Sequence, residues 1–318
     1  MRVFITGITG MVGSHLAEYI IKEKLGEVYG LVRWRSPLDN INHFKEKVNL
    51  VSGDLNDLNS LIAVIRQVKP HRIFHLAAQS YVQDSFKITS ETLKTNIIGT
   101  TNLLDSVKIN KLDPLIHICS SSEVYGQVLE SEVPIKENNP LRPASPYAVS
   151  KVGEDFIALQ YFLSYGMKTI RTRMFTHTGP RRGNVFAESS FAKQIAEIEA
   201  NIHPTGIVSV GNLESVRTFS DVRDAVRAYW VLLDKCEPGE VYNIGGKETM
   251  TVGKMLDTLK SFSKIKINHK TDKNLLRPSD VTLQIPDCSK FLKKTNWQPK
   301  FSVEETLHDL LNYHRQKL

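Results

Sequence analysis

The first half of the chain alternates between short apolar runs and longer stretches in which apolar residues recur at helical spacing. The short runs, rich in Val, Ile and Phe, predict buried strands at residues 3–7, 27–32, 48–53, 72–78, 115–121 and 169–175. The longer stretches predict amphipathic helices at residues 16–24, 58–68, 100–110 and 151–166. Because this alternation is typical of βαβ units, we expect an α/β fold with a doubly wound parallel sheet.

The regular order loosens after about residue 175, where loops rich in Gly, Pro, Asn and Arg separate shorter elements. We therefore expect one domain at residues 1–175 and a smaller, mixed α/β domain at residues 176–318. Strands of the second domain can return to the sheet of the first. The last segment, residues 302–318, has the apolar spacing of a closing amphipathic helix.

Composition narrows the class of protein. A chain of 318 residues with 41% hydrophobic residues can bury a full core. Its three cysteines, Cys119, Cys236 and Cys288, have no metal-binding spacing, so we expect neither disulfides nor a metal site, and a reducing, cytoplasmic compartment. The N-terminal residues predict no signal peptide and no membrane span. The net charge of +7 comes from scattered residues, which favours an anionic small ligand over nucleic acid.

Glycines follow the first predicted strand in FITGITGMVGSHLAEYI and open a helix. Gly7, Gly10 and Gly13 form GxxGxxG, which lets the backbone approach a pyrophosphate at the helix N-terminus. Tight turns and helix packing also use glycine, but this position favours nucleotide binding. The sheet is thus expected to be of the Rossmann type.

The end of the second strand indicates which dinucleotide binds. An acidic residue there would hold a ribose hydroxyl, whereas this chain has Arg33 and Arg35 in LVRWRS, which suit a 2′-phosphate. The alternative is a solvated basic loop. We therefore predict NADP as the cofactor, with NAD as the alternative.

Two further motifs carry candidate chemistry. In SPYAVSK, Tyr147 and Lys151 lie four residues apart on one helix face, so the ammonium can lower the phenol pKa toward neutrality. The same spacing is common on ordinary helix surfaces. In CSSSEVYG, a predicted strand ends with Ser121 near the carboxylate of Glu123, which could act as a base or could only cap a turn.

Together these motifs resemble the extended short-chain dehydrogenase/reductase family over nearly the whole chain. Within it the chain is most similar to GDP-mannose 4,6-dehydratases and GDP-4-keto-6-deoxymannose reductases, as HLAAQS, TNIIGT, PRRG, GNLESVRTFSDVRD and LRPSDV also indicate. The resemblance implies cofactor contacts from Gly7, Thr9, Gly10, Met11, Val12, Gly13, Arg33, Arg35, Asp54, Leu55, Leu76, Ala77, Ala78, Gln79, Tyr147 and Lys151. It implies substrate contacts from Ser80, Ser85, Glu123, Thr176, Arg182, Asn212, Arg217 and Arg277.

The resemblance implies a lyase that eliminates water from GDP-mannose or a close GDP-sugar. Tyr147 would take the proton of the 4-hydroxyl, Lys151 would tune Tyr147 and hold the nicotinamide ribose, and Ser121 would bind the developing ketone oxygen. Glu123 would remove the proton on carbon 5, which a simple reductase or epimerase does not need. A homodimer or homotetramer is expected.

The chain departs from the family pattern at three places. Thr176 stands where relatives usually have Asn, Ser121 where dehydratases have Thr, and Thr218 follows Arg217 where dehydratases have Asp. These differences keep open an NADPH-dependent reductase or another nucleotide-sugar epimerase. A noncatalytic, NADP-sensing regulator is a third alternative, against which the intact Ser121, Tyr147 and Lys151 argue.

Overall fold

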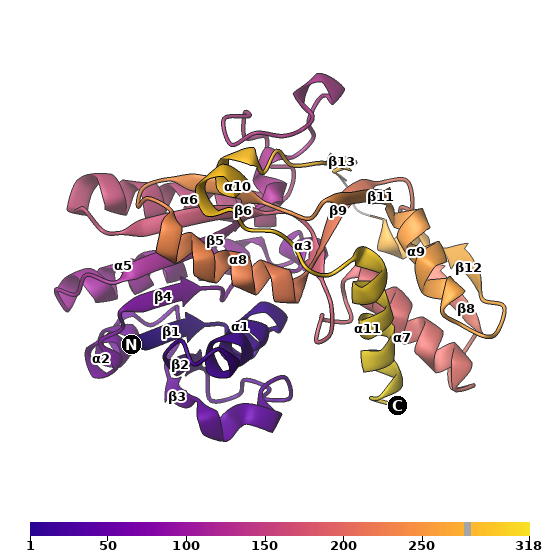
Figure 1. The fold of residues 1–318 in the computed structure, drawn as a ribbon, viewed down its shortest axis with the longest axis horizontal. Coiled ribbons are helices and arrows are strands. Elements are labelled where there is room, and N and C mark those ends of the chain that lie inside the picture. Colours follow the sequence, from indigo (N-terminus) through magenta and orange to yellow (C-terminus); the bar gives the residue numbers. More distant parts are fainter. Residues whose placement is uncertain (277–280) are drawn as a thin grey trace.

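The computed structural model describes residues 1–276 and 281–318, and a parallel sheet forms the centre of its N-terminal half (Figure 1). Neighbouring strands pair in the order β10-β6-β5-β4-β1-β2-β3. The strands are β1 (Arg2–Thr6), β2 (Glu27–Val32), β3 (Asn49–Ser52), β4 (Arg72–His75), β5 (Leu115–Ser121), β6 (Thr169–Met174) and β10 (Val241–Ile244). The order reverses beside β1, so the Rossmann-type doubly wound sheet is confirmed, as is each strand predicted for the first half.

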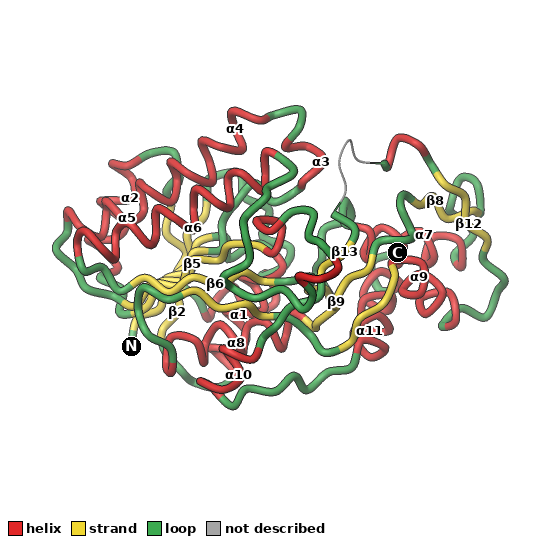
Figure 2. Tube along the Cα trace, turned by 90° about the horizontal axis from the view of Figure 1, so that it is seen from above, coloured by secondary structure: helices red, strands yellow, loops and turns green. Residues whose placement is uncertain are grey.

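Helices cover both faces of this sheet (Figure 2). One face carries α1 (Met11–Lys22), α8 (Val222–Lys235) and α10 (Ser289–Thr295). The other carries α2 (Leu58–Val68), α5 (Gly99–Ile109) and α6 (Pro146–Tyr165). The predicted helices are confirmed, although α6 begins before residue 151 because Ser145 caps it through the Ala148 N–H and Pro146 occupies its first turn.

The C-terminal half contributes elements to both parts of the molecule. β10 pairs in parallel with β6, and α8 packs against α1, so this half completes the N-terminal sheet. Its other elements lie beyond the carboxyl ends of that sheet (Figure 1). They are β7 (His177–Thr178), α7 (Ala187–Glu199), β8 (Ile207–Val210), β9 (Val216–Asp221), β11 (Glu248–Thr251), α9 (Val252–Ser261), β12 (Asn268–Thr271), β13 (Leu283–Gln284) and α11 (Val303–Arg315).

Short helical turns join these layers. They are η1 (Asn42–Lys47), α3 (Val82–Ser85), α4 (Thr89–Leu93), the π-helical η2 (Lys94–Ile98), η3 (Ser122–Tyr125), η4 (Glu130–Glu132) and η5 (Lys273–Leu275). α7, α9 and α11 share an apolar core built around Phe191, Leu256 and Leu307. Among the described residues, no helix combines the length and apolarity needed to cross a membrane.

Candidate active site

A cleft of about 880 Å³ lies where the strands of the parallel sheet end, between that sheet and the C-terminal elements. Residues that directly follow β1, β2, β3, β4 and β6 line it, as do the last residues of β5. α7 and β9 supply the opposite wall. Ligands of doubly wound folds bind at this edge of the sheet, so the cleft is the candidate active site.

The glycine turn forms one end of the cleft. Gly7 has a φ of +75°, and a Cβ on it would lie 2.8 Å from the backbone nitrogen of Ala77. A Cβ on Gly13 would lie 2.1 Å from the carbonyl oxygen of Gly7. Gly10 caps α1 without a side chain, so the first amides of the helix face the cleft beside Thr9, Met11 and Val12. The turn therefore presents backbone amides to an anionic group, as a dinucleotide pyrophosphate requires.

Of the two arginines predicted to bind a 2′-phosphate, only one lines the cleft. Arg33 lines the cleft, whereas Arg35 does not and instead stacks at 4.1 Å over the ring of Trp34, which is 81% exposed. Sequence reasoning missed Asn40, which also lines the cleft and donates to the Thr9 carbonyl oxygen at 2.9 Å. Only the path of the loop between β2 and η1 could reveal this contact, because the two residues lie far apart in the sequence.

The middle of the cleft follows the ends of β3 and β4. Asp54 and Leu55 line it after β3, and Leu76, Ala77, Ala78, Gln79 and Ser80 line it after β4. Asn96, within the π-helical turn, accepts from the Gln79 N–H at 2.8 Å and donates to the Gln79 carbonyl oxygen and to Ser150 Oγ. This buried amide thus ties the segment after β4 to α6.

Tyr147 and Lys151 lie on the face of α6 that meets the cleft, with exposures of 9% and 4%. Burial raises the pKa of the Tyr147 phenol, while the Lys151 ammonium and a hydrogen bond with Ser121 act in the opposite direction. The expected influence of Lys151 is present, and in the protein alone burial outweighs it. Ser121 Oγ also accepts from the Glu123 N–H at 3.2 Å.

Glu154 is a charged neighbour that sequence reasoning missed. Its carboxylate lies 2.6 Å from Lys151 Nζ, and the two side chains are 1% and 5% exposed. Burial raises the pKa of Glu154 to about 7 against the influence of Lys151. Burial alone would lower the pKa of Lys151, but Glu154 raises it above its ordinary value. The spacing of three residues from Lys151 was a signal, since it places both side chains on one helix face.

Glu123 lines the cleft from η3, which directly follows β5. Its neighbour Ser122 also lines the cleft, where Ser122 Oγ donates to Gln284 Oε1 at 2.9 Å. The structure therefore brings Ser121, Glu123, Tyr147 and Lys151 together in one cleft.

The expected substrate residues divide into three groups. Those that line the cleft are Ser80, Glu123, Thr176, Arg182, Asn212 and Arg217. Ser85 does not line it; this residue is fully buried, and its hydroxyl oxygen accepts from the Tyr147 N–H at 3.2 Å. Ser85 therefore positions the start of α6. Arg277 lies outside the described residues.

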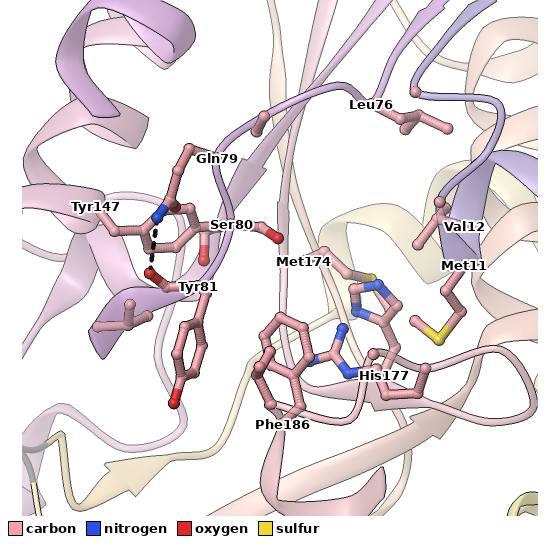
Figure 3. Close-up of a pocket in the computed structure, with 18 of the residues that line it drawn as sticks. Met11, Val12, Leu76, Gln79, Ser80, Tyr81, Tyr147, Met174, His177 and Phe186 are labelled. Carbon is pink, nitrogen blue, oxygen red and sulfur yellow. Dashed lines mark hydrogen bonds between the residues drawn. The ribbon is translucent and has the colours of Figure 1, made fainter. Parts of the chain in front are cut away.

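The PRRG loop approaches the cleft from the opposite wall. Arg181 pairs with Glu18 of α1 at 2.6 Å, and the Pro180 carbonyl oxygen lies 3.0 Å from His15 Nε2. Arg182 stacks over the Phe186 ring at 3.5 Å. Figure 3 shows Gln79 and Tyr147 on one side of the cleft and Phe186 with His177 on the other. The loop is thus anchored on α1 while Arg182 reaches the cleft.

Comparisons with known proteins agree with this geometry. The model of the GDP-mannose 4,6 dehydratase family matches residues 4–310. A human GDP-mannose 4,6 dehydratase is 32% identical and covers 97% of this chain and 90% of its own length. A GDP-6-deoxy-D-mannose reductase from Pseudomonas aeruginosa is 29% identical and covers 98% of this chain and 96% of its own.

Solved structures show the same fold. The Pseudomonas aeruginosa protein RMD, in complex with NADPH, has a TM-score of 0.86 at 28% identity, covering 100% of this chain and 99% of its own. A dTDP-glucose 4,6-dehydratase from Streptomyces venezuelae, with NAD bound, has a TM-score of 0.85 at 26% identity, covering 99% of this chain and 97% of its own. With a family model that spans nearly its whole length, the chain belongs to the GDP-mannose 4,6-dehydratase family.

Proposed function

We propose that this protein removes water from GDP-mannose, or a close GDP-sugar, with NADP as a recycled hydride carrier. The observation that carries the proposal is the presence of Glu123 in the same cleft as Ser121, Tyr147 and Lys151. The last three suffice for hydride transfer at carbon 4. The carboxylate adds the base that elimination across carbons 5 and 6 requires.

The cleft residues fit NADP. The glycine turn leaves no space for a Cβ at Gly7 or Gly13, and it presents helix amides where a pyrophosphate can bind. Arg33 is the cationic side chain that would hold a 2′-phosphate, and Lys151 would hold the nicotinamide ribose. When bound, NADP supplies a hydride acceptor for carbon 4 and later a hydride donor for carbon 6.

The protein residues perform the proton transfers. Tyr147 removes the 4-hydroxyl proton, and Ser121 donates a hydrogen bond to the oxygen as it becomes a ketone. The ketone acidifies carbon 5, so Glu123 can remove that proton and give it to the carbon 6 hydroxyl, which leaves as water. The proton that Tyr147 took from the 4-hydroxyl would then return to carbon 5. The products are a 4-keto-6-deoxy sugar nucleotide and one water, and no external reductant is consumed.

Incubation of the purified protein with GDP-mannose, without any added reductant, tests the proposal. We expect mass spectrometry to find a product that has lost one water. A sharper test uses Glu123→Gln, which should reduce bound NADP with GDP-mannose yet neither exchange the carbon 5 proton with heavy water nor release water. Product formation by this variant at the parent's rate would show that Glu123 is not the base.

The second candidate is an NADPH-dependent reductase of a GDP-4-keto-6-deoxy sugar. It is favoured by the reductase relative, which matches 96% of its own length, and by Thr218 after Arg217. A parent protein that oxidises NADPH with the keto sugar, but leaves GDP-mannose unchanged, would establish this alternative instead.

We further propose that residues 176–318 mainly hold the sugar nucleotide and that the protein forms a homodimer or homotetramer in the cytoplasm. α6 supports oligomerisation, because Val149, Phe156 and Leu163 recur every seven residues and are 45%, 50% and 71% exposed. Light scattering should detect an oligomer that Phe156→Glu dissociates. The free thiols of Cys119, Cys236 and Cys288 suit a reducing compartment.

A further inference from the structure

Glu188, the second residue of α7, is an acidic side chain in the cleft to which the sequence assigned no role. It lines the cleft and is 5% exposed. Across residues 1–276 and 281–318, no hydrogen bond or ion pair joins its carboxylate to another side chain or to the backbone, and its oxygens are not among the fully buried atoms without a partner, so they open onto the cleft. Buried carboxylates are normally paired, so this one requires an explanation. The helix dipole favours an acidic side chain in the first turn of α7, but it would favour an exposed carboxylate as much, so it does not explain why Glu188 is buried.

Arg182 is the charged neighbour of Glu188. Arg182, Glu188 and Tyr147 all line the cleft. Burial lowers the pKa of the Arg182 guanidinium, whereas Glu188 and the Tyr147 phenol raise it. Phe186, which stacks under the guanidinium, lies across the cleft from Tyr147 (Figure 3). Arg182 Nε is buried without a hydrogen-bond partner in the described chain. Two oppositely charged groups with unused hydrogen-bonding capacity thus share one wall of the cleft, across from the proposed catalytic phenol.

The chemistry of these two groups limits what they can bind. A carboxylate accepts hydrogen bonds from neutral donors and repels phosphate, so Glu188 does not suit the diphosphate of a nucleotide. The neighbourhood of Tyr147 is where the reacting carbon 4 of a hexose must lie in the proposed function. A hexose offers several hydroxyls there, each able to donate to a carboxylate and accept from a guanidinium.

We propose that Glu188 accepts hydrogen bonds from hydroxyls of the hexose, on the same wall as Arg182, and thereby selects a neutral sugar within the GDP-sugar class. The inference rests on the proposed function. Glu188 compensates the charge of Arg182 in the empty cleft and exchanges cleft water for sugar hydroxyls when substrate binds. A hexose that carries a carboxylate would be repelled at this wall.

Calorimetric titration of the NADPH-loaded protein tests this role, because a reduced cofactor cannot accept hydride and turnover is blocked. Glu188→Gln should weaken GDP-mannose binding about tenfold, the loss of one or two hydrogen bonds to a charged group, and leave GDP binding within about twofold. Glu91→Gln is the matched control, since Glu91 also lines the cleft but is exposed and already accepts from Thr95. It should change neither affinity.

Unchanged GDP-mannose affinity in Glu188→Gln, or equal losses for GDP and GDP-mannose, would overturn the inference while the proposed function stands. A parent protein that binds neither nucleotide would overturn both. Thermal unfolding checks that the variant is folded; if it is not, Glu188→Asp keeps the charge but shortens its reach and should show the same sugar-specific loss.

Discussion

Gly13→Ala should damage the glycine turn through a contact that no rotamer can relieve. The added Cβ would lie 2.1 Å from the Gly7 carbonyl oxygen and 2.7 Å from the Ile8 Cα, which are both backbone atoms. Gly7 cannot retreat, because it is already packed against the backbone of Ala77. Overpacking of this kind costs about 1–3 kcal/mol, from which the better helix propensity of alanine recovers less than about 1 kcal/mol.

Urea unfolding of cofactor-free protein measures this loss without the added stability that a ligand confers. We expect Gly13→Ala to lower the free energy of unfolding by about 1–2 kcal/mol and to weaken NADPH binding more than about tenfold, since the amides of the turn no longer converge. Gly10→Ala is the matched control, because its Cβ would lie 3.3 Å from the nearest atom, and it should lose less than half as much stability. Parent-like stability and NADPH affinity in Gly13→Ala would refute the reasoning.

Three further predictions concern the cleft and the helix α6 beside it. Tyr147→Phe should leave NADPH binding nearly unchanged while turnover falls by about 10²–10⁴, the loss expected for a positioned general base; near-normal turnover would assign that proton to another group. Arg33→Ser should remove the preference for NADP over NAD, measured as the ratio of the two dissociation constants. Arg35→Ser should keep that preference, because Arg35 stacks on exposed Trp34 outside the cleft. An equal loss of preference in both variants would contradict these different roles. Glu154→Ala leaves the buried Lys151 ammonium without its counter-ion and should lower the free energy of unfolding by about 3 kcal/mol, measured in urea, and an unchanged midpoint would count against it.

The sequence allowed a good prediction of the first half of the fold because its strands are apolar runs bounded by turn residues, a local signal. β10 was not predicted as a distinct element, since VYNI is a four-residue run whose pairing partner, β6, lies far back along the chain. Local patterns do not contain such contacts. The expectation of returning strands could therefore name neither the segment nor its partner.

The same contrast between local signals and long-range contacts holds for the site. Gly7, Tyr147 and Lys151 could be located because their chemistry depends on spacing along one turn or one helix. The direction of a side chain in a loop or a short helical turn could not be located in this way, so the positions of Arg35 and Ser85 outside the cleft were not foreseen. Glu154 and Glu188 were missed for a different reason: a charged residue in a helical pattern is ordinarily assigned to the solvent face, whereas both of these are buried.

The pairing of β10 with β6 has a consequence for synthesis of the chain. When a ribosome has released β6, that strand has an unpaired edge, and the sheet face that α8 will cover is still bare. α8 and β10, which cover that face and that edge, are synthesised only after the segment that begins at β7, some seconds later at roughly 5–20 residues per second. A nascent chain stalled before residue 241 would therefore expose both an open strand edge and apolar surface, which makes that stretch of translation the interval when chaperone binding is most needed.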